Sequence, residues 1–442
     1  MLSKLFSFFL ILVYVAVAVG QQTEPVLATA TGLSFTINDL SPDGRKLYEE
    51  RSQLIARQRT KFFNDWVYDL LLETEAKMRG TTPQKVQADE VAKAAAPTEA
   101  QIKAVFDANR QTIGSRTIDQ VRTQIVDFLK HESEEKQLDS FTESLKTKHK
   151  FVPGRNVNAA DLKPSDVVAS IGSRTVTAAE YENRFKIPLH NLRAGIYEQT
   201  KADFEAAIVT KLIETEAKKR NVDASTVIAT EITNKLKDYS DYERMYLEDM
   251  LLSRLLTQYA VKFDLEAPQP LILNVSPDDD PSIGSATAKV TVVAFVDFQC
   301  SACAAFSPLL KQVVSEFGGD VRLVVRDYPL TSMHPEAMNA ALAGYAARQQ
   351  GKFFEMVDLM YRNQGALDDG SLRKYAEQAG LNAEQFERDF HSAAAAAEVK
   401  KDIADGTSYG VGGTPTVFVN GVQLQRLTTR ATREAIKNAL KK

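Results

Sequence analysis

The stretch "VDFQCSACAAFSPLL", residues 296–310, contains both cysteines of this 442-residue chain, Cys300 and Cys303. It overlaps the apolar, β-branched run "KVTVVAFVDF" at 289–298, which is typical of a strand buried on both faces. The residues that follow the cysteines fit a helix. The segment therefore predicts a strand that leads directly into a helix, with a Cys-x-x-Cys pair at the junction.

Three kinds of site could use such a pair. A structural zinc site needs about four ligands, and the chain has no further cysteine and only scattered histidines, at 131, 149, 190, 334 and 391. A structural disulfide across two residues closes a very small loop and removes little entropy from the unfolded chain. We therefore favour a redox pair and expect neither a metal nor another cofactor.

The position of Cys300 also suggests its role. A helix N-terminus favours negative charge, so the pKa of Cys300 should fall below the ordinary thiol value. Cys303 lies one turn further into the helix and should be less exposed. We expect Cys300 to attack a substrate and Cys303 to resolve the mixed disulfide.

The pattern after the cysteines continues an α/β domain. A second apolar strand is predicted at "VRLVVRDY" (321–328), and a helical stretch extends from about 334 to 404. "VGGTPTVFVNGVQLQ" (411–425) predicts two short strands around the turn Asn420-Gly421. A last helix, "TREAIKNALKK", ends the chain.

These segments, in this order, resemble the DsbA-like branch of the thioredoxin superfamily across residues 289–442. The resemblance implies a thioredoxin fold with a helical insertion. It also implies that Pro415 is a cis proline beside the cysteines and that the backbone of Thr414 binds an extended substrate. Pro308 matches the proline that kinks the first helix of the fold and is expected to be structural, as is His334, which reads as a helix start.

Two departures from that branch concern its redox chemistry. Related domains often carry an acidic residue six positions before the first cysteine, and here that residue is Ala294. Asp297 lies nearer, but an exposed position would prevent it from replacing that acid. Ser301 and Ala302 between the cysteines include no histidine, which removes one donor to the thiolate. We predict a less oxidising couple than that of the strongest oxidants of this branch.

The first 270 residues contain an internal repeat. The pentapeptide "ETEAK" occurs at 73–77 and at 214–218, an offset of 141 residues from 73 to 214. The same offset aligns apolar residues that recur every four positions and so share one helix face, namely Phe63, Val67 and Leu71 with Phe204, Ile208 and Leu212. We interpret residues 21–155 and 156–268 as two copies of a mostly helical module, joined to the C-terminal domain by a connector at 269–288.

The helical module itself resembles the N-terminal module of SurA-like periplasmic chaperones. The matching segments are "PTEAQIKAVFDANR" (97–110), "SIGSRTVTAAEYENRF" (170–185) and "FEAAIVTKLIETEAKKRNV" (204–222). The chain leaves no room for the prolyl-isomerase domain that often follows the first of these segments. The resemblance therefore implies that the helices hold unfolded chains, while a spacer or a dimerisation platform is the alternative.

The N-terminus and the overall charge suggest where the protein acts. Residues 1–20, "MLSKLFSFFLILVYVAVAVG", have one early lysine, an apolar run and a small-residue end, which is typical of a secretory signal peptide. An uncleaved membrane anchor is the alternative, although the run is short for one. The formal net charge of -4 gives no electrostatic footprint for nucleic acid. We expect a periplasmic protein in a compartment where disulfides form.

These observations lead to two hypotheses. The first is an exported thiol–disulfide oxidoreductase or isomerase that acts on unfolded or disulfide-containing proteins and exchanges electrons with a redox partner protein. The second is a periplasmic chaperone or assembly factor whose thioredoxin-like domain is mainly a binding module. Retention of both thiols favours the first, and the redox direction stays open.

Overall fold

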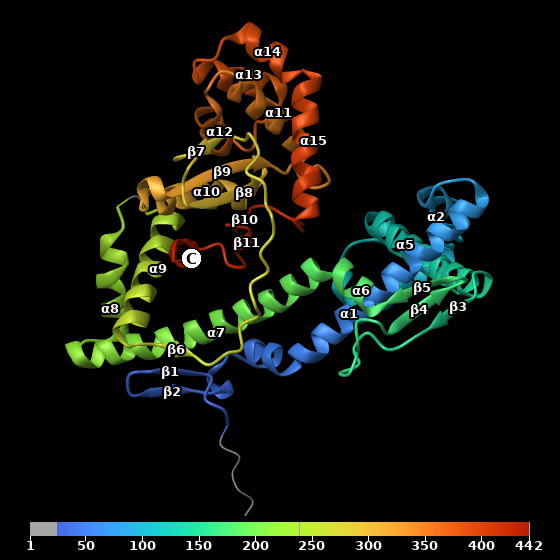
Figure 1. The fold of residues 1–442 in the computed structure, drawn as a ribbon, viewed down its shortest axis with the longest axis horizontal. Helices are drawn as coiled ribbons and strands as arrows, with labels where there is room; N and C mark the ends of the chain where they lie inside the picture. Colours follow the sequence, from blue (N-terminus) through green and yellow to red (C-terminus); the bar gives the residue numbers. More distant parts are fainter. Residues whose placement is uncertain (1–23, 238, 442) are drawn as a thin grey trace, which may run out of the picture.

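A computed structural model of the protein describes residues 24–237 and 239–441 (Figure 1). The predicted signal peptide at 1–20 lies outside these residues. The described chain is a long helical region followed by an α/β domain, which confirms the predicted fold class. Within 24–237 and 239–441, no helix is both long enough and apolar enough to cross a membrane.

The helical region contains nine helices and six short strands within the described residues. In chain order they are β1 (Ala28–Ala30), β2 (Leu33–Phe35), α1 (Pro42–Arg79), α2 (Pro83–Val91), α3 (Glu99–Ala108), α4 (Arg110–Ile113), α5 (Ile118–Lys148), β3 (Phe151–Pro153), β4 (Val167–Ile171), β5 (Arg174–Thr177), α6 (Ala178–Arg184), α7 (Lys186–Arg220), α8 (Ala224–Glu231), α9 (Asp241–Gln258) and β6 (Lys262–Phe263).

The helix ends follow the capping signals in the sequence. Each of the threonines 98, 117 and 177 forms a capping box with the residue three positions later. Ser41 caps α1, whose first residue is Pro42. Gly80 ends α1 with a φ of 67°, a left-handed conformation that glycine adopts without strain.

The two copies of the repeat exchange their hairpins. The hairpin β1–β2 of the first copy packs on helices of the second copy, and β6, which follows α9, completes its sheet in the order β2-β1-β6. The hairpin β4–β5 of the second copy packs on α1, α2 and α5 of the first copy, in the sheet β3-β4-β5. The boundary between the sequence copies therefore differs from the boundary between the packing units.

The exchange depends on the two long helices. At 1.5 Å per residue, the 38 residues of α1 extend about 57 Å, and α1 lies alongside the 35-residue α7 (Figure 1). Each hairpin precedes the long helix of its own copy and packs in the core formed by the helices of the other copy. Phe35 and Val176, which correspond at the offset of 141, are both buried in these exchanged positions. The repeat therefore forms two equivalent helical cores, and each core contains the hairpin of the other copy.

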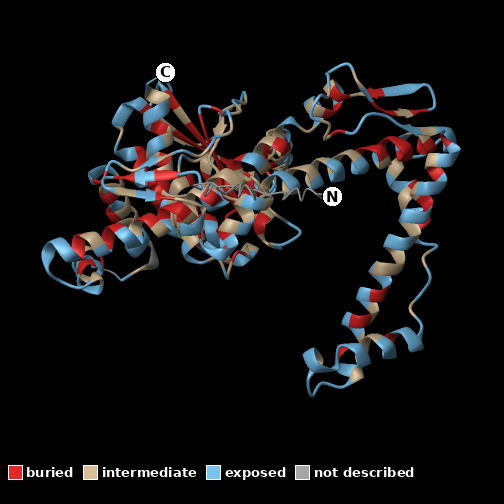
Figure 2. Cartoon of the chain, turned by 90° about the horizontal axis from the view of Figure 1, so that it is seen from below, coloured by how far each residue is buried: buried red, intermediate tan, exposed pale blue. Residues whose placement is uncertain are grey.

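Buried residues form several separate cores along the chain (Figure 2). One helical core surrounds Trp66, Leu71 and Tyr181, and a second surrounds Phe204, Ile208 and Leu255. A smaller helical core lies between α3 and α5. The largest core belongs to the α/β domain. Because these cores are separate, stability is divided among units rather than concentrated in one centre.

The α/β domain is built around a five-stranded sheet in the order β11-β10-β8-β9-β7. Its elements are β7 (Ser282–Ile283), β8 (Val290–Val296), α10 (Ser301–Ser315), β9 (Val321–Asp327), α11 (Ala337–Arg348), α12 (Phe353–Arg362), α13 (Asp369–Gln378), α14 (Ala383–Phe390), α15 (Ala393–Ser408), β10 (Thr416–Val419), β11 (Val422–Gln423) and α16 (Thr429–Leu440).

The sheet confirms the predicted strand order and adds one strand. β8 and β9 are parallel, and β10 and β11 form the predicted hairpin around Asn420-Gly421. Part of the expected connector at 269–288 packs on this domain instead, because β7 pairs with β9 and the Leu273 amide donates to the Gly421 carbonyl. Helices α11 to α15 form the insertion between β9 and β10 (Figure 1).

The α/β domain docks on α7 and α9 through a buried polar contact. The Glu205 side chain, 2% exposed, accepts hydrogen bonds at 2.5 Å from Arg426 and from Arg430. Asp249 of α9 accepts from the amide of Arg430 and the hydroxyl of Thr429. Breaking such a buried pair costs about 3–5 kcal/mol, so these contacts hold the domain on the helices.

Candidate active site

The strand β8 delivers Cys300 to the start of α10. Six of its seven residues are buried, as expected of a central parallel strand. Cys300 is the N-cap residue of α10, and the backbone amide of Ala304 donates to its carbonyl. Cys300 and Cys303 are 8% and 1% exposed and are both free thiols. The sulfur nearer to solvent therefore belongs to the first cysteine.

The pKa values of the two thiols are shifted in opposite directions. The pKa of Cys300 is lowered to about 5, mainly by a hydrogen bond from Cys303 and further by Thr414 and the backbone amides of Ala302 and Cys303, against the effect of burial. The pKa of Cys303 is raised, mainly by burial and also by its hydrogen bond to Cys300. At neutral pH the pair therefore holds one thiolate, on Cys300, and one thiol, on Cys303.

The loop before β10 forms the second wall of the site. The Thr414–Pro415 peptide bond is cis, as the resemblance implies. In its thiol form Cys300 donates a hydrogen bond to the Thr414 carbonyl oxygen at 3.4 Å. Among the described atoms, the buried Thr414 hydroxyl has no other hydrogen-bond partner, so it is free to donate to the Cys300 thiolate. The structure thus brings all four predicted site residues together.

Asp297 is buried rather than exposed. Its carboxylate accepts hydrogen bonds from the amides of Gln299 and Leu330 and contacts the Nδ1 atom of His334 at 2.8 Å. These three partners fix the turn between β8 and α10 and tie it to the start of the helical insertion. Asp297 and His334 therefore have a structural role beside the cysteines.

Gln364 is a site residue that the sequence did not suggest. Its side-chain amide donates to the carbonyl oxygens of Phe298 and Cys300, both at 2.9 Å. It lies in the loop after α12, 64 residues beyond Cys300. A lone glutamine in a polar loop carries no recognisable motif, so only the folded chain reveals that it anchors the backbone of the nucleophile.

A small pocket lies behind the redox pair. Its walls include Ala294, Cys303, Pro415 and Tyr361, and its volume is about 20 Å³. A space of that size holds about one water molecule. Ala294 is 2% exposed and contributes only a methyl group, so this wall offers no carboxylate to Cys303.

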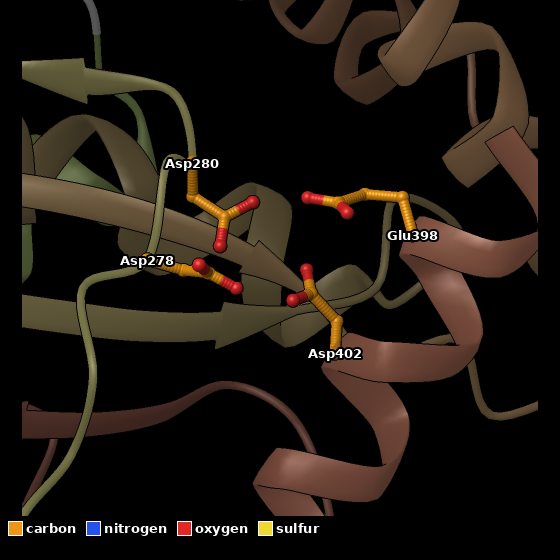
Figure 3. Close-up of side chains that lie close together, drawn as sticks. All are labelled: Asp278, Asp280, Glu398 and Asp402. Carbon is orange, nitrogen blue, oxygen red and sulfur yellow. The ribbon is translucent and has the colours of Figure 1, made fainter. Parts of the chain in front are cut away.

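A separate group of carboxylates lies between the segment before β7 and helix α15 (Figure 3). One oxygen from each of Asp278, Asp280, Glu398 and Asp402 lies within 4.8 Å of the others, a spacing that could hold a cation. Cationic side chains already pair with these carboxylates. Arg326, fully buried, pairs with Asp280 and Asp402, and Arg348 and Lys401 add further ion pairs. The carboxylates thus surround and bind the buried guanidinium of Arg326.

The C-terminal domain is similar in sequence to a known protein family and to parts of known proteins. Residues 276–440 match the model of a protein family described as Thioredoxin. The chain is 36% identical over 165 residues to the Na(+)/H(+) antiporter NhaA 1 of Mycolicibacterium vanbaalenii, which is 36% of this chain and 27% of that protein. It is 38% identical over 151 residues to NhaA 1 of Salinispora arenicola, which is 34% of this chain and 23% of that protein. The chain thus spans about a quarter of the length of these curated relatives.

Solved structures that match part of this chain include a thioredoxin-like oxidoreductase from Silicibacter pomeroyi and oxidised BdbD from Bacillus subtilis. The first is 26% identical and covers 37% of this chain and 94% of its own, with a TM-score of 0.35. The second is 21% identical and covers 40% and 100%, also with a TM-score of 0.35. Together with the sheet topology, the family match identifies residues 276–440 as a thioredoxin domain.

Proposed function

We propose that this chain is an exported thiol–disulfide oxidoreductase or isomerase that acts on protein substrates. The observation that carries the proposal is the geometry of one Cys-x-x-Cys pair, with Cys300 at the N-cap of α10 and Cys303 buried behind it. A Cys300 thiolate at a helix N-terminus faces the Thr414–Pro415 loop, and a protonated Cys303 lies directly behind it. This is the arrangement that thiol–disulfide exchange requires.

The reaction follows from that arrangement. The Cys300 thiolate attacks one sulfur of a substrate disulfide, forms a mixed disulfide and releases the other substrate sulfur as a thiolate. Cys303 then attacks Cys300, which releases the substrate and leaves the enzyme oxidised. The low pKa of Cys300 makes it both a populated nucleophile and a good leaving group. The reverse sequence oxidises a substrate, and the redox partner sets the direction.

The helical region would hold unfolded clients beside this site. Helix α7 contacts the loop that leads to Thr414. Gly410 in this loop has a φ of 81°, and a β-carbon at this position would lie only 2.4 Å from the Ile187 side chain. Thr414 follows only four residues later, and the Cys300 sulfur lies 3.4 Å from its carbonyl. A polypeptide bound along α7 would therefore be close to the nucleophile, and binding there would raise its effective concentration.

The redox assignment is tested with the full chain. Cys300→Ala should abolish the reduction of insulin and the refolding of scrambled ribonuclease, because it removes the only nucleophilic thiolate. Cys303→Ala should instead accumulate mixed disulfides with substrate, since nothing resolves them. Activity that persists in Cys300→Ala would refute the proposal and favour a chaperone that uses this domain for binding.

The cellular setting is part of the same proposal. An oxidising compartment such as the periplasm suits a protein whose two cysteines work as a redox pair. Trapping the thiols in cells would reveal the direction. Oxidised cysteines would indicate an oxidase, and reduced cysteines an isomerase or a reductase kept active by a partner.

A further inference from the structure

Two residues that line the pocket behind the redox pair, Ser307 and Tyr361, carry hydroxyl groups that have no part in the proposed exchange reaction. Tyr361, at the end of α12, lines the pocket together with Cys303, Ala294 and Pro415. Its ring is held edge-on against Phe298 at 5.7 Å between centroids. Burial and the nearby charges of Cys303, Asp327 and Cys300 raise its pKa well above the ordinary value. The phenol therefore stays protonated and remains a hydrogen-bond donor.

Cys303 needs such a donor. To resolve a mixed disulfide it must become a thiolate, and burial raises its pKa. Its pocket contains no carboxylate at the position of Ala294. The buried carboxylate nearest in sequence, Asp297, is already bound by two amides and His334. Among the described residues that line this pocket, there is therefore no carboxylate that could accept the proton of Cys303.

The other charged groups around the pocket are engaged elsewhere. The Lys311 ammonium in the wall pairs with Asp358 at 2.8 Å and lies over the ring of Phe354. Asp327 does not line the pocket, and burial and the charge of Asp402 raise its pKa. Besides Ser307, Tyr361 is the residue of this wall that carries a hydroxyl group, and the charge of Cys303 contributes to its raised pKa.

We propose that the Tyr361 hydroxyl, acting through the single water that the pocket admits, stabilises the developing Cys303 thiolate during resolution. This inference rests on the proposed exchange reaction. The Cys303 S–H bond breaks, a bond forms between the Cys303 and Cys300 sulfurs, and the bond from Cys300 to the substrate sulfur breaks. The proton passes to the departing substrate sulfur, which leaves as a thiol. Two electrons move from the cysteine pair to the substrate.

The test isolates the resolution step in the full chain. Reduced protein is reacted with oxidised glutathione, and the release of the Cys300-bound glutathione is followed by quenched flow from pH 5 to 8. Tyr361→Phe keeps the ring and its packing on Phe298. It should slow this release by about 10- to 100-fold, the effect of losing one hydrogen bond to a charged group. The absorbance titration of the Cys300 thiolate should not change.

Tyr375→Phe is the matched control, because the Tyr375 hydroxyl donates to the Ala366 carbonyl at 3.0 Å and does not line the pocket. Its release rate should equal that of the unaltered protein. Release within twofold of the unaltered rate in Tyr361→Phe, or equal slowing in both variants, would overturn the role of Tyr361. Failure of the unaltered protein to form or resolve the mixed disulfide would overturn the proposed function instead.

Discussion

The Cys300 sulfur and the Thr414 carbonyl oxygen lie 3.4 Å apart, across 114 residues of sequence. The same threonine has a buried hydroxyl without another partner among the described atoms. One residue therefore serves both states of the nucleophile: its carbonyl accepts from the thiol, and its hydroxyl donates to the thiolate. This pairing links the acidity of Cys300 to the loop expected to bind substrate.

The first prediction concerns that acidity. The Cys300 thiolate, followed by absorbance at 240 nm, should titrate near pH 5. Thr414→Val removes the hydroxyl at almost constant volume and should raise the pKa by about one unit, the worth of one hydrogen bond to a charged group. Thr416→Val is the control, because that hydroxyl donates to the Gly413 carbonyl and not to sulfur. An unchanged midpoint in Thr414→Val would contradict the role of the hydroxyl.

The same pKa predicts a pH dependence of stability for the reduced protein. The Cys300 pKa is lower in the folded than in the unfolded chain, so folding favours the thiolate. Its stabilising contribution is complete above the unfolded value of about 8.5 and is lost as the pH falls toward 5. The difference in unfolding free energy between Cys300→Ser and the reduced protein should shrink over that range. A constant difference would contradict it.

The second prediction concerns redox potential. A Cys300 pKa of about 5 lies between those of thioredoxin, about 7, and DsbA, about 3.5. Because thiolate stability favours the reduced state, the potential should lie between about −270 and −120 mV. Ala302 is exposed, so Ala302→His adds a donor without repacking. It should lower the Cys300 pKa by about one unit and raise the potential by roughly 30 mV.

Glutathione equilibration measures both potentials. Ala305→His is the control, because Ala305 lies in α10 beyond both cysteines and not between them. This substitution should leave the potential unchanged. A potential for the unaltered protein as oxidising as that of DsbA would refute the prediction of a weaker oxidant. It would show that the missing histidine does not limit the couple.

The third prediction concerns the coupling between the two regions. Glu205→Gln removes the charge that Arg426 and Arg430 share, so about 3–5 kcal/mol of docking should be lost. Limited proteolysis should then cut the connector faster. Activity on unfolded ribonuclease should fall at least fivefold, while turnover of a small dithiol should stay within twofold. Equal losses on both substrates would favour the spacer interpretation of the helices.

Glu214→Gln is the matched control for this variant. Glu214 lies on the same helix, but its side chain is half-exposed and pairs with Lys211 at 3.7 Å. An exposed pair of this kind contributes little to stability. Both proteolysis and activity should therefore match those of the unaltered protein, and a loss equal to that of Glu205→Gln would contradict the docking role.

The sequence predicts the parts of this molecule that depend on local patterns. The strand before Cys300, the Asn420-Gly421 hairpin and the capping boxes at 98, 117 and 177 each follow from a few adjacent residues. Cys300 and Cys303 are recognisable because their spacing and their flanking elements carry the chemistry. These features form wherever the chain adopts the same local geometry.

The features that the sequence did not predict depend on contacts between distant segments. Nothing in the repeat shows that each hairpin packs on the helices of the other copy, because corresponding positions of the two copies carry the same apolar pattern. Gln364 and Tyr361 come close to the cysteines only after α12 packs on α10. Asp297 is buried by contacts from Leu330 and His334, more than thirty residues away.

The fourth prediction concerns the carboxylates around Arg326. Burial and the charge of Asp402 raise the pKa of Asp280 to about 8, against the opposing effect of Arg326. The folded chain therefore binds more protons than the unfolded chain between about pH 4 and 8, and stability should fall as the pH rises through that range. Asp280→Asn should remove this part of the decline, a change on the order of 1–3 kcal/mol between pH 5 and 8.

Urea unfolding at several pH values, followed by circular dichroism, measures that decline. Asp279→Asn is the control, because its side chain is 76% exposed and should not alter the slope. Trp66, the single tryptophan, lies in the distal helical core and reports on a different unit by fluorescence. Its transition should be the same in Asp280→Asn and in the unaltered protein. An identical pH slope in Asp280→Asn would mean that Arg326 keeps Asp280 ionised and that the cluster is fully compensated.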